Sequence, residues 1–366
     1  MALKVAIVGL PNVGKSTLFN ALTQTASAQA ANYPFCTIEP NTGEVAVPEP
    51  RLDALAKIAG SKEIIPARIT FVDIAGLVRG ASKGEGLGNQ FLANIRDCDA
   101  VAFVARCFED GDIVHVEGRI DPTSDLEIVE MELMLADLES LEKRVPALEK
   151  RAKVGADKES ANTLRLATIA LNLLREGRPA RAAKIDADDE KAWHMLQLLT
   201  ALPALYVCNV DEGSADKGNS YSDLVAERAA KDNAKSVVIS AQIESEIALL
   251  DAEERAEFLE TLGLEEPGLN RLIREAYSLL DLQTYFTVGP KEARAWTIHI
   301  GDTGPQAAGV IHTDFEKGYI RAETIAFEDF IALGGENGAK EAGKMKAEGK
   351  DYIVKDGDVM HFRFNV

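Results

Sequence analysis

A glycine-bounded segment near the N-terminus has the residue types and spacing that bind nucleotide phosphates. Residues 9–16 read Gly-Leu-Pro-Asn-Val-Gly-Lys-Ser, directly after an apolar stretch and directly before a stretch typical of a helix. The glycines let backbone N–H groups turn inward around a β-phosphate, and the start of the helix adds its positive end. We expect Lys15 to reach the β- and γ-phosphates and the Ser16 hydroxyl to ligate Mg²⁺. The segment therefore predicts a site for a nucleoside triphosphate.

Further phosphate and metal contacts are predicted downstream of this segment. Asp73 follows an apolar stretch at residues 68–72 that reads as a buried strand, and Gly76 lies three residues later. The Asp73 carboxylate can hold a water molecule on Mg²⁺, and the Gly76 N–H can donate to the γ-phosphate. Thr37 lies in a loop between the first helix and this strand. We predict it as a second direct Mg²⁺ ligand, because such loops are ordered by the γ-phosphate and Mg²⁺.

The residue that follows Gly76 bears on the rate of hydrolysis. Ras-like GTPases place a water-orienting glutamine there, whereas this chain has Leu77. An aliphatic side chain cannot orient water, so we expect slow hydrolysis by the chain alone. Residues 80–88 are dense in glycine and form either a nucleotide-sensitive switch, which we favour, or only a flexible connector. The missing glutamine also leaves open a non-catalytic scaffold that nucleotide binding merely stabilises.

The segment that would read the base departs from the guanine-specific pattern. GTPases use Asn-Lys-x-Asp, whose aspartate accepts hydrogen bonds from guanine, but residues 209–212 here are Asn-Val-Asp-Glu. Discrimination built on paired polar groups is lost when the pairing breaks. Adenine offers its 6-amino group and N7 to Asn209 or nearby backbone, and the loop Ser240-Ala241-Gln242 would close over the base. We therefore predict a preference for ATP, with a GTPase that keeps guanine specificity as the alternative.

The strands and helices that must position these residues follow from hydrophobic periodicity. Short apolar stretches separated by helical segments predict an α/β fold, a parallel sheet with helices on both faces. The expected strands cover residues 4–8, 68–72, 101–105, 204–208 and 236–239.

Two further regions depart from this alternation. Residues 124–201 carry apolar residues at helical spacing, which predicts an antiparallel helical hairpin with turns near 155 and at 177–179. Its first helix is expected to bury a stripe formed by Ile128, Met131, Leu135, Leu138 and Leu141. After residue 282, short alternating stretches and glycine turns predict a small β-rich domain, with a polar loop at 334–349 that carries several lysines.

The charge and the cysteine content indicate which partners and which cellular setting to expect. The formal net charge of −19 argues against DNA and against general nucleic-acid affinity of the whole surface. Residues 143–184 nevertheless contain eleven Lys or Arg against four acids, which form either an RNA-binding surface or a merely solvated helix face. No apolar run reaches the roughly 18 residues that span a bilayer. Four scattered cysteines favour a reducing, cytoplasmic setting over disulfides or zinc.

Taken together, these motifs resemble those of the Obg-like ATPase family along the whole chain. The matching segments are residues 9–17, 32–41, 80–89, 106–110, 349–352 and 361–365. The resemblance implies a P-loop G domain at 1–282 with a coiled-coil insertion at 124–201, and a TGS domain of ubiquitin-like β-grasp fold at 283–366. It also implies ATP hydrolysis and binding to the ribosome, mainly the large subunit, with the basic insertion and the TGS domain contacting rRNA.

The same resemblance adds residues to the predicted site. It implies that Asn12 holds a monovalent cation, commonly K⁺, and that Phe108 and Val210 line the base pocket. The predicted catalytic set is Lys15, Asn12, Thr37, Asp73 and Gly76. The predicted nucleotide contacts are Asn12, Val13, Gly14, Lys15, Ser16, Thr17, Phe35, Phe108, Asn209, Val210, Glu212, Ser240 and Ala241.

Overall fold

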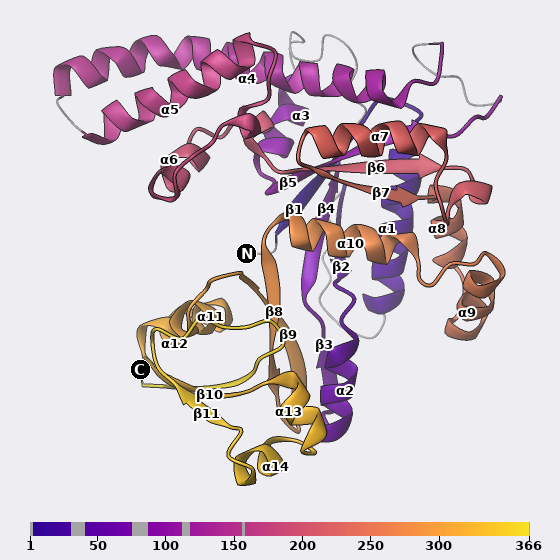
Figure 1. The fold of residues 1–366 in the computed structure, drawn as a ribbon, viewed down its shortest axis with the longest axis vertical. Coiled ribbons are helices and arrows are strands. Elements are labelled where there is room, and N and C mark those ends of the chain that lie inside the picture. Colours follow the sequence, from indigo (N-terminus) through magenta and orange to yellow (C-terminus); the bar gives the residue numbers. More distant parts are fainter. Residues whose placement is uncertain (1–2, 31–40, 75–86, 112–117, 156–157, 366) are drawn as a thin grey trace. The chain divides into compact units, whose positions relative to one another are not determined.

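The computed structural model describes residues 3–30, 41–74, 87–111, 118–155 and 158–365, which form two compact units (Figure 1). The first unit comprises Met1–Glu44 and Thr70–Ala276, and the second comprises Val45–Ile69 and Tyr277–Val366. The boundary expected near residue 282 differs from this division, because it assigned residues 45–69 to the N-terminal domain.

The first unit is built on a six-stranded sheet with the order β2-β4-β1-β5-β6-β7. Its strands are β1 (Lys4–Val8), β2 (Thr42–Ala46), β4 (Arg68–Asp73), β5 (Ala100–Cys107), β6 (Ala204–Val210) and β7 (Lys235–Ile239). The pairs β1–β4, β1–β5, β5–β6 and β6–β7 are parallel, and every residue of β5 and β6 is buried. The predicted α/β fold with a largely parallel sheet is confirmed.

Six helices outside the insertion accompany this sheet in the described part of the chain. They are α1 (Lys15–Ala30), α3 (Leu87–Arg96), α7 (Ser220–Lys231), α8 (Ala241–Ile247), α9 (Ala252–Thr261) and α10 (Gly268–Leu279). Helix α7 packs against β6 and β7. It begins with a capping box in which Asn219 accepts hydrogen bonds from the N–H groups of Tyr221 and Ser222.

The expected helical hairpin lies between β5 and β6. Helices α4 (Pro122–Gly155) and α5 (Lys158–Arg175) pack side by side, and the chain returns to the sheet through the short helix α6 (Glu190–His194) (Figure 1). Buried Asp137 on α4 fastens this return, because its carboxylate accepts hydrogen bonds from Leu199 N–H at 2.9 Å and from Thr200 N–H at 2.8 Å. Burial raises the pKa of this carboxyl, and the hydrogen bonds from Thr200 and Leu199 oppose that shift.

The apolar stripe predicted for the first hairpin helix is confirmed at its C-terminal end, where Leu141 is buried and Leu138 packs against the hairpin core, but it is wrong in phase at its N-terminal end. Met131 is 48% exposed, whereas the buried side chains of α4 include Leu126, Val129, Leu133 and Met134. The reason is that α4 packs on β5 and α7 as well as on α5, so its buried residues do not all follow the stripe that faces α5.

The second unit contains a mixed sheet with the order β11-β10-β12-β8-β9-β3. Its strands are β3 (Glu63–Ile65), β8 (Leu282–Val288), β9 (Glu292–His299), β10 (Tyr319–Ile325), β11 (Lys346–Glu348) and β12 (Val359–Phe364). An antiparallel β8–β9 hairpin followed by a helix, with the last strand β12 parallel to the first strand β8, is the topology of a β-grasp fold. The predicted fold is confirmed, with β3 as an added strand parallel to β9.

The helices of this unit correct one expectation. They are α2 (Pro50–Ala59), α11 (Gly304–Ile311), α12 (Thr313–Lys317), α13 (Phe327–Ala332) and α14 (Glu336–Glu341). Residues 334–349, predicted as a polar loop, contain α14 and also β11, which pairs antiparallel with β10. The many lysines and glycines of this segment are not typical of strands, and β11 forms only because it pairs with β10.

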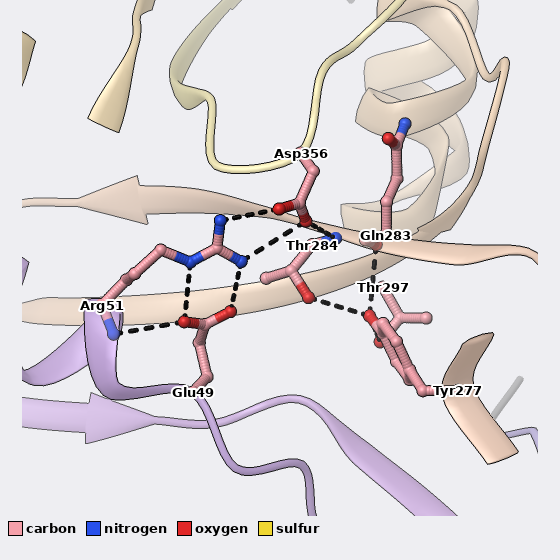
Figure 2. A network of polar contacts seen from close by, with 7 residues as sticks. All are labelled: Glu49, Arg51, Tyr277, Gln283, Thr284, Thr297 and Asp356. Carbon is pink, nitrogen blue, oxygen red and sulfur yellow. Dashed lines mark hydrogen bonds and ion pairs between the residues drawn. The ribbon is translucent and has the colours of Figure 1, made fainter. Parts of the chain in front are cut away.

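A network of polar contacts joins residues 45–69 to the C-terminal strands within this unit (Figure 2). The Arg51 guanidinium donates to both carboxylate oxygens of Glu49, at 2.8 and 2.5 Å, and to Asp356 at 2.7 Å. Asp356 also accepts a hydrogen bond from the backbone N–H of Thr284 at 3.0 Å. The hydrogen bonds to Glu49, more than those to Asp356, raise the pKa of Arg51, so this cation is held firmly between two anions.

Within the described residues, no helix has both the length and the apolar composition that crossing a bilayer would require.

Candidate functional site

A cavity of about 710 Å³ opens where the strands of the first sheet end. Its lining comes from Asn12 and residues 14–17 after β1, residues 108–110 after β5, residues 209–213 at and beyond the end of β6, and residues 240–242 after β7. Ligands of open α/β sheets bind at this carboxyl edge, and small-molecule sites occupy roughly 300–1,000 Å³. The cavity is therefore the expected size and in the expected place for a nucleotide.

The backbone of the phosphate-binding segment has the conformation that its glycines allow. Asn12 and Gly14 both have positive φ, 63° and 94° respectively. A Cβ atom on Gly9 would lie 2.6 Å from the carbonyl oxygen of Val104, and one on Gly14 would lie 2.2 Å from the Asn209 side-chain nitrogen. Both glycines are thus required by close approaches of neighbouring groups as well as, at Gly14, by backbone conformation.

Lys15 lines the cavity and interacts electrostatically with Asp73, the last residue of β4. The Lys15 ammonium donates to the carbonyl oxygen of Leu10 at 2.6 Å, and the residue is only 6% exposed. Burial lowers the pKa of Lys15 to about 8, although the nearby Asp73 carboxylate acts in the opposite direction. Burial likewise raises the pKa of Asp73, opposed by Lys15. A ligand that brings phosphate oxygens to Lys15 would relieve the desolvation of its charged form.

One oxygen of Asp73 bears on the predicted Mg²⁺ site. Asp73 Oδ1 is buried and has no hydrogen-bond partner among the described residues, and an oxygen in that position is costly unless something donates to it. A water molecule bound to Mg²⁺ is such a donor, and Ser16, the predicted direct ligand, lines the cavity. The residues present fit a hydrated Mg²⁺ ion.

Asn209 has a structural role that the sequence did not predict. Its side-chain amide donates to the carbonyl oxygen of Val13 at 2.9 Å and accepts from the N–H of Ala241 at 2.9 Å. The residue is 5% exposed, so this buried amide ties the phosphate-binding segment to the loop after β7. The amide nitrogen keeps a second N–H and the amide oxygen a second lone pair, so the predicted contact of Asn209 with the base stays a prediction.

The base side of the cavity combines apolar walls with acidic groups. Phe108 and buried Val210 are lining residues, and the buried Ser240 hydroxyl has no partner within the described chain. Four carboxylates also line this side: Glu109, Asp110, Asp211 and Glu212. They repel phosphate, whereas Lys15 attracts it, so the electrostatics favour a nucleotide with its triphosphate at the Lys15 end.

The structure brings most of the predicted site residues together. Around the cavity lie Asn12, Gly14, Lys15, Ser16, Thr17, Phe108, Asn209, Val210, Glu212, Ser240 and Ala241. The Val13 side chain is buried outside the lining, and only its carbonyl is engaged, by Asn209. Phe35, Thr37, Gly76 and Leu77 lie outside the described residues. Sequence reasoning missed Glu109, Asp110, Asp211 and Gly213 as lining residues.

A parallel sheet whose first strand leads through a phosphate-binding segment into a helix, with an aspartate at the end of the adjacent strand, defines a P-loop nucleoside triphosphatase. A family model described as 50S ribosome-binding GTPase matches residues 4–135, and the YchF-GTPase_C model, described as a protein of unknown function, matches residues 282–365. The ribosome-binding ATPase YchF of Haemophilus influenzae is 60% identical over 366 residues, with all of both chains covered. The chain belongs to the YchF family.

Two further relatives support this assignment. The ribosome-binding ATPase YchF of Bacillus subtilis is 52% identical over 368 residues, again with both chains covered in full. The solved structure of the YchF GTPase of Schizosaccharomyces pombe has a TM-score of 0.88 at 37% identity and covers 99% of this chain and 97% of its own. The fold of the whole chain is therefore that of a solved member of the family.

Proposed function

We propose that this chain is a Mg²⁺-dependent ATPase that binds the large ribosomal subunit and acts in the cytoplasm as a nucleotide-dependent regulator of translation. The observation that carries the proposal is the base side of the cavity. The segment Asn209–Glu212 has valine and glutamate where the guanine-reading pattern has lysine and aspartate. The relatives named as ribosome-binding ATPases support both halves of the proposal.

The residues of the phosphate end divide the work of hydrolysis. Lys15 binds the β- and γ-phosphates, while Ser16 and Thr37 hold Mg²⁺ directly and Asp73 holds it through water. When bound, Mg²⁺ neutralises charge on the phosphate oxygens. Gly76 donates its N–H to the γ-phosphate, and Asn12 on the rim of the cradle provides an oxygen ligand for K⁺. Because Leu77 cannot orient water, the isolated chain turns over slowly.

The base side offers adenine a suitable environment. The Phe108 ring can stack on a purine, and Val210 supplies a buried apolar contact. The Ser240 hydroxyl and the Glu212 carboxylate remain as polar groups able to accept from the adenine 6-amino group. Guanine presents a carbonyl oxygen where adenine has that amino group, so the Glu212 carboxylate, which can only accept, would face an acceptor there.

Competition between nucleotides tests the base preference. With labelled ATP bound to the purified protein, unlabelled ATP should displace it at a concentration at least about tenfold lower than GTP, the ratio expected for one unmatched hydrogen-bonding group. A higher affinity for GTP would refute the proposal and favour the guanine-specific alternative.

The rate of ATP hydrolysis tests the cation role of Asn12. Replacing Na⁺ by K⁺ in the buffer should accelerate hydrolysis in the wild type and have no effect in Asn12→Ala.

The basic excess of residues 143–184 is partly neutralised within the hairpin. Lys143, Arg165, Arg175, Arg178 and Arg181 pair with Glu139, Asp189, Glu142, Glu176 and Glu130 respectively. No ion pair between described residues involves Lys150, Arg151, Lys153 or Lys158, which are exposed where α4 ends and α5 begins. These four residues, the hairpin tip, are available for rRNA phosphates.

Charge reversal at the hairpin tip tests the ribosome contact. The double variant Lys150→Glu, Lys153→Glu should bind ribosomes about tenfold more weakly in cosedimentation at moderate salt, with a shallower salt dependence, because two phosphate contacts are lost. The matched control is Lys217→Glu, Lys231→Glu, which reverses two exposed lysines outside the hairpin. Equal binding by both double variants would remove the hairpin tip from the interface.

A further inference from the structure

The loop after β5 carries the aromatic ring of the base side. Residues 108–110 line the cavity; Phe108 is half-buried, and Glu109 and Asp110 are exposed. A stacking surface contributes affinity only if it is already in place, since ordering a mobile ring on binding costs conformational entropy. The contacts that hold this loop therefore bear on the affinity for a base.

Arg106, on β5, holds the loop from the interior of the sheet. It is 1% exposed, and its guanidinium donates to the carbonyl oxygens of Phe108 at 3.3 Å and Asp110 at 3.2 Å. The guanidinium also lies over the Phe108 ring, 4.7 Å from its centroid. A cation over an aromatic face is attracted by its negative π-density, so the same side chain holds both the backbone and the ring.

The first turn of α7 holds the loop from the other direction. Asn219, the N-cap residue of α7, donates from its side-chain amide to the Cys107 carbonyl oxygen at 2.7 Å. The Tyr221 hydroxyl donates to the Glu109 carboxylate at 2.7 Å. Arg106 and the start of α7 together donate hydrogen bonds to four consecutive residues, 107–110, which include Phe108 and the residues before and after it in the sequence.

We propose that Arg106, Asn219 and Tyr221 are positioning residues that fix Phe108 as a preformed stacking surface for the purine base. The inference rests on the proposed function in that a purine nucleotide occupies the cavity. It goes further by assigning the base affinity to side chains that do not touch the nucleotide. The phosphate end, with Lys15 and the glycines, does not depend on these contacts.

A comparison of two ligands separates this role from a merely structural one. Binding of ATP and of inorganic tripolyphosphate, which has neither base nor sugar, is measured by calorimetry on the full chain. Arg106→Lys should weaken ATP binding by about tenfold, as partial loss of one base–aromatic stack would, and leave tripolyphosphate affinity within about twofold. The KM for ATP should rise by a similar factor while kcat at saturation changes little, because the phosphates remain in place.

Two tyrosine variants keep the test independent of any folding defect at buried Arg106. Tyr221→Phe removes a single hydrogen bond and should weaken ATP binding by about threefold without affecting tripolyphosphate. The control Tyr206→Phe removes the hydrogen bond from Tyr206 to Asp232, the C-cap residue of α7, and should change neither affinity.

Three results would overturn the inference. Equal weakening of both ligands in Arg106→Lys would indicate a structural role, and wild-type ATP affinity in a folded Tyr221→Phe would show that the loop needs no fixing. Failure of the wild type to bind ATP would remove both this inference and the proposed function, so the two failures are distinguishable.

Discussion

Replacement of Lys15 by alanine should lower the rate of ATP hydrolysis at saturating ATP by at least about a hundredfold, the range found when one donor to developing charge is removed. Lys15 is the only lysine or arginine among the lining residues of the cavity within the described chain. Without it, no lysine or arginine that the structure places in the lining opposes the charge that accumulates on the phosphate oxygens. The measurement is phosphate release under multiple turnover.

Two comparisons make this result interpretable. The exposed lysine variant Lys153→Ala should hydrolyse ATP at the wild-type rate, since Lys153 lies on the hairpin. Without nucleotide, Lys15→Ala should melt within a few degrees of the wild type, because burial already disfavours the charged ammonium of Lys15. If turnover is equally low before and after the substitution, the chain is the non-catalytic scaffold considered from its sequence.

A second large effect is expected at Gly14. An added methyl group in Gly14→Ala would lie 2.2 Å from the side-chain nitrogen of Asn209, and φ at this position is 94°. Asn209 cannot withdraw without losing its hydrogen bonds to Val13 and Ala241. The phosphate-binding segment must therefore move, and we expect the ATP affinity measured by calorimetry to fall by about a hundredfold or more, since several N–H donors lose their alignment.

Gly263 provides the matched control for this substitution. Its φ of 68° is also left-handed, but nothing lies within 4 Å of an added Cβ atom. Gly263→Ala should cost about 1–2 kcal/mol of stability from backbone strain alone and leave ATP affinity unchanged. Comparable losses of affinity in both variants would mean that left-handed strain, rather than the contact with Asn209, causes the effect at Gly14.

The parts of the fold and site that the sequence predicted depend on contiguous residues. The segment at 9–16 carries its own glycine spacing, and each strand of the first sheet except β2 contains a short apolar run. The β-grasp topology and its domain position came from resemblance to a family. The pairing of β3 with β9 could not be predicted, because a three-residue strand meets a partner more than 200 residues away.

The missed residues of the site show a different limit. Arg106 is one charged residue inside a strand that is otherwise apolar, which was a signal of a specific internal partner. The sequence Asn219-Ser220-Tyr221-Ser222 signalled a helix cap, but not that the cap would also bind the loop after β5. The structural role of Asn209 could not be predicted, because its partners Val13 and Ala241 lie far from it in sequence.

Residues 45–69 belong to the second unit, and this has a consequence for any attempt to express that unit as a fragment. A fragment that begins at residue 282, where the C-terminal family match starts, would lack β3 and α2 and would lose Glu49 and Arg51. Strand β9 would then present an unpaired backbone edge, which invites aggregation, and Asp356 would lose its cation. Exchanging residues 282–365 between relatives would likewise combine the C-terminal strands of one protein with the α2 helix of another, whose side chains match different strands. The second unit is formed by two separate segments of the chain, and a fragment or chimaera must contain both.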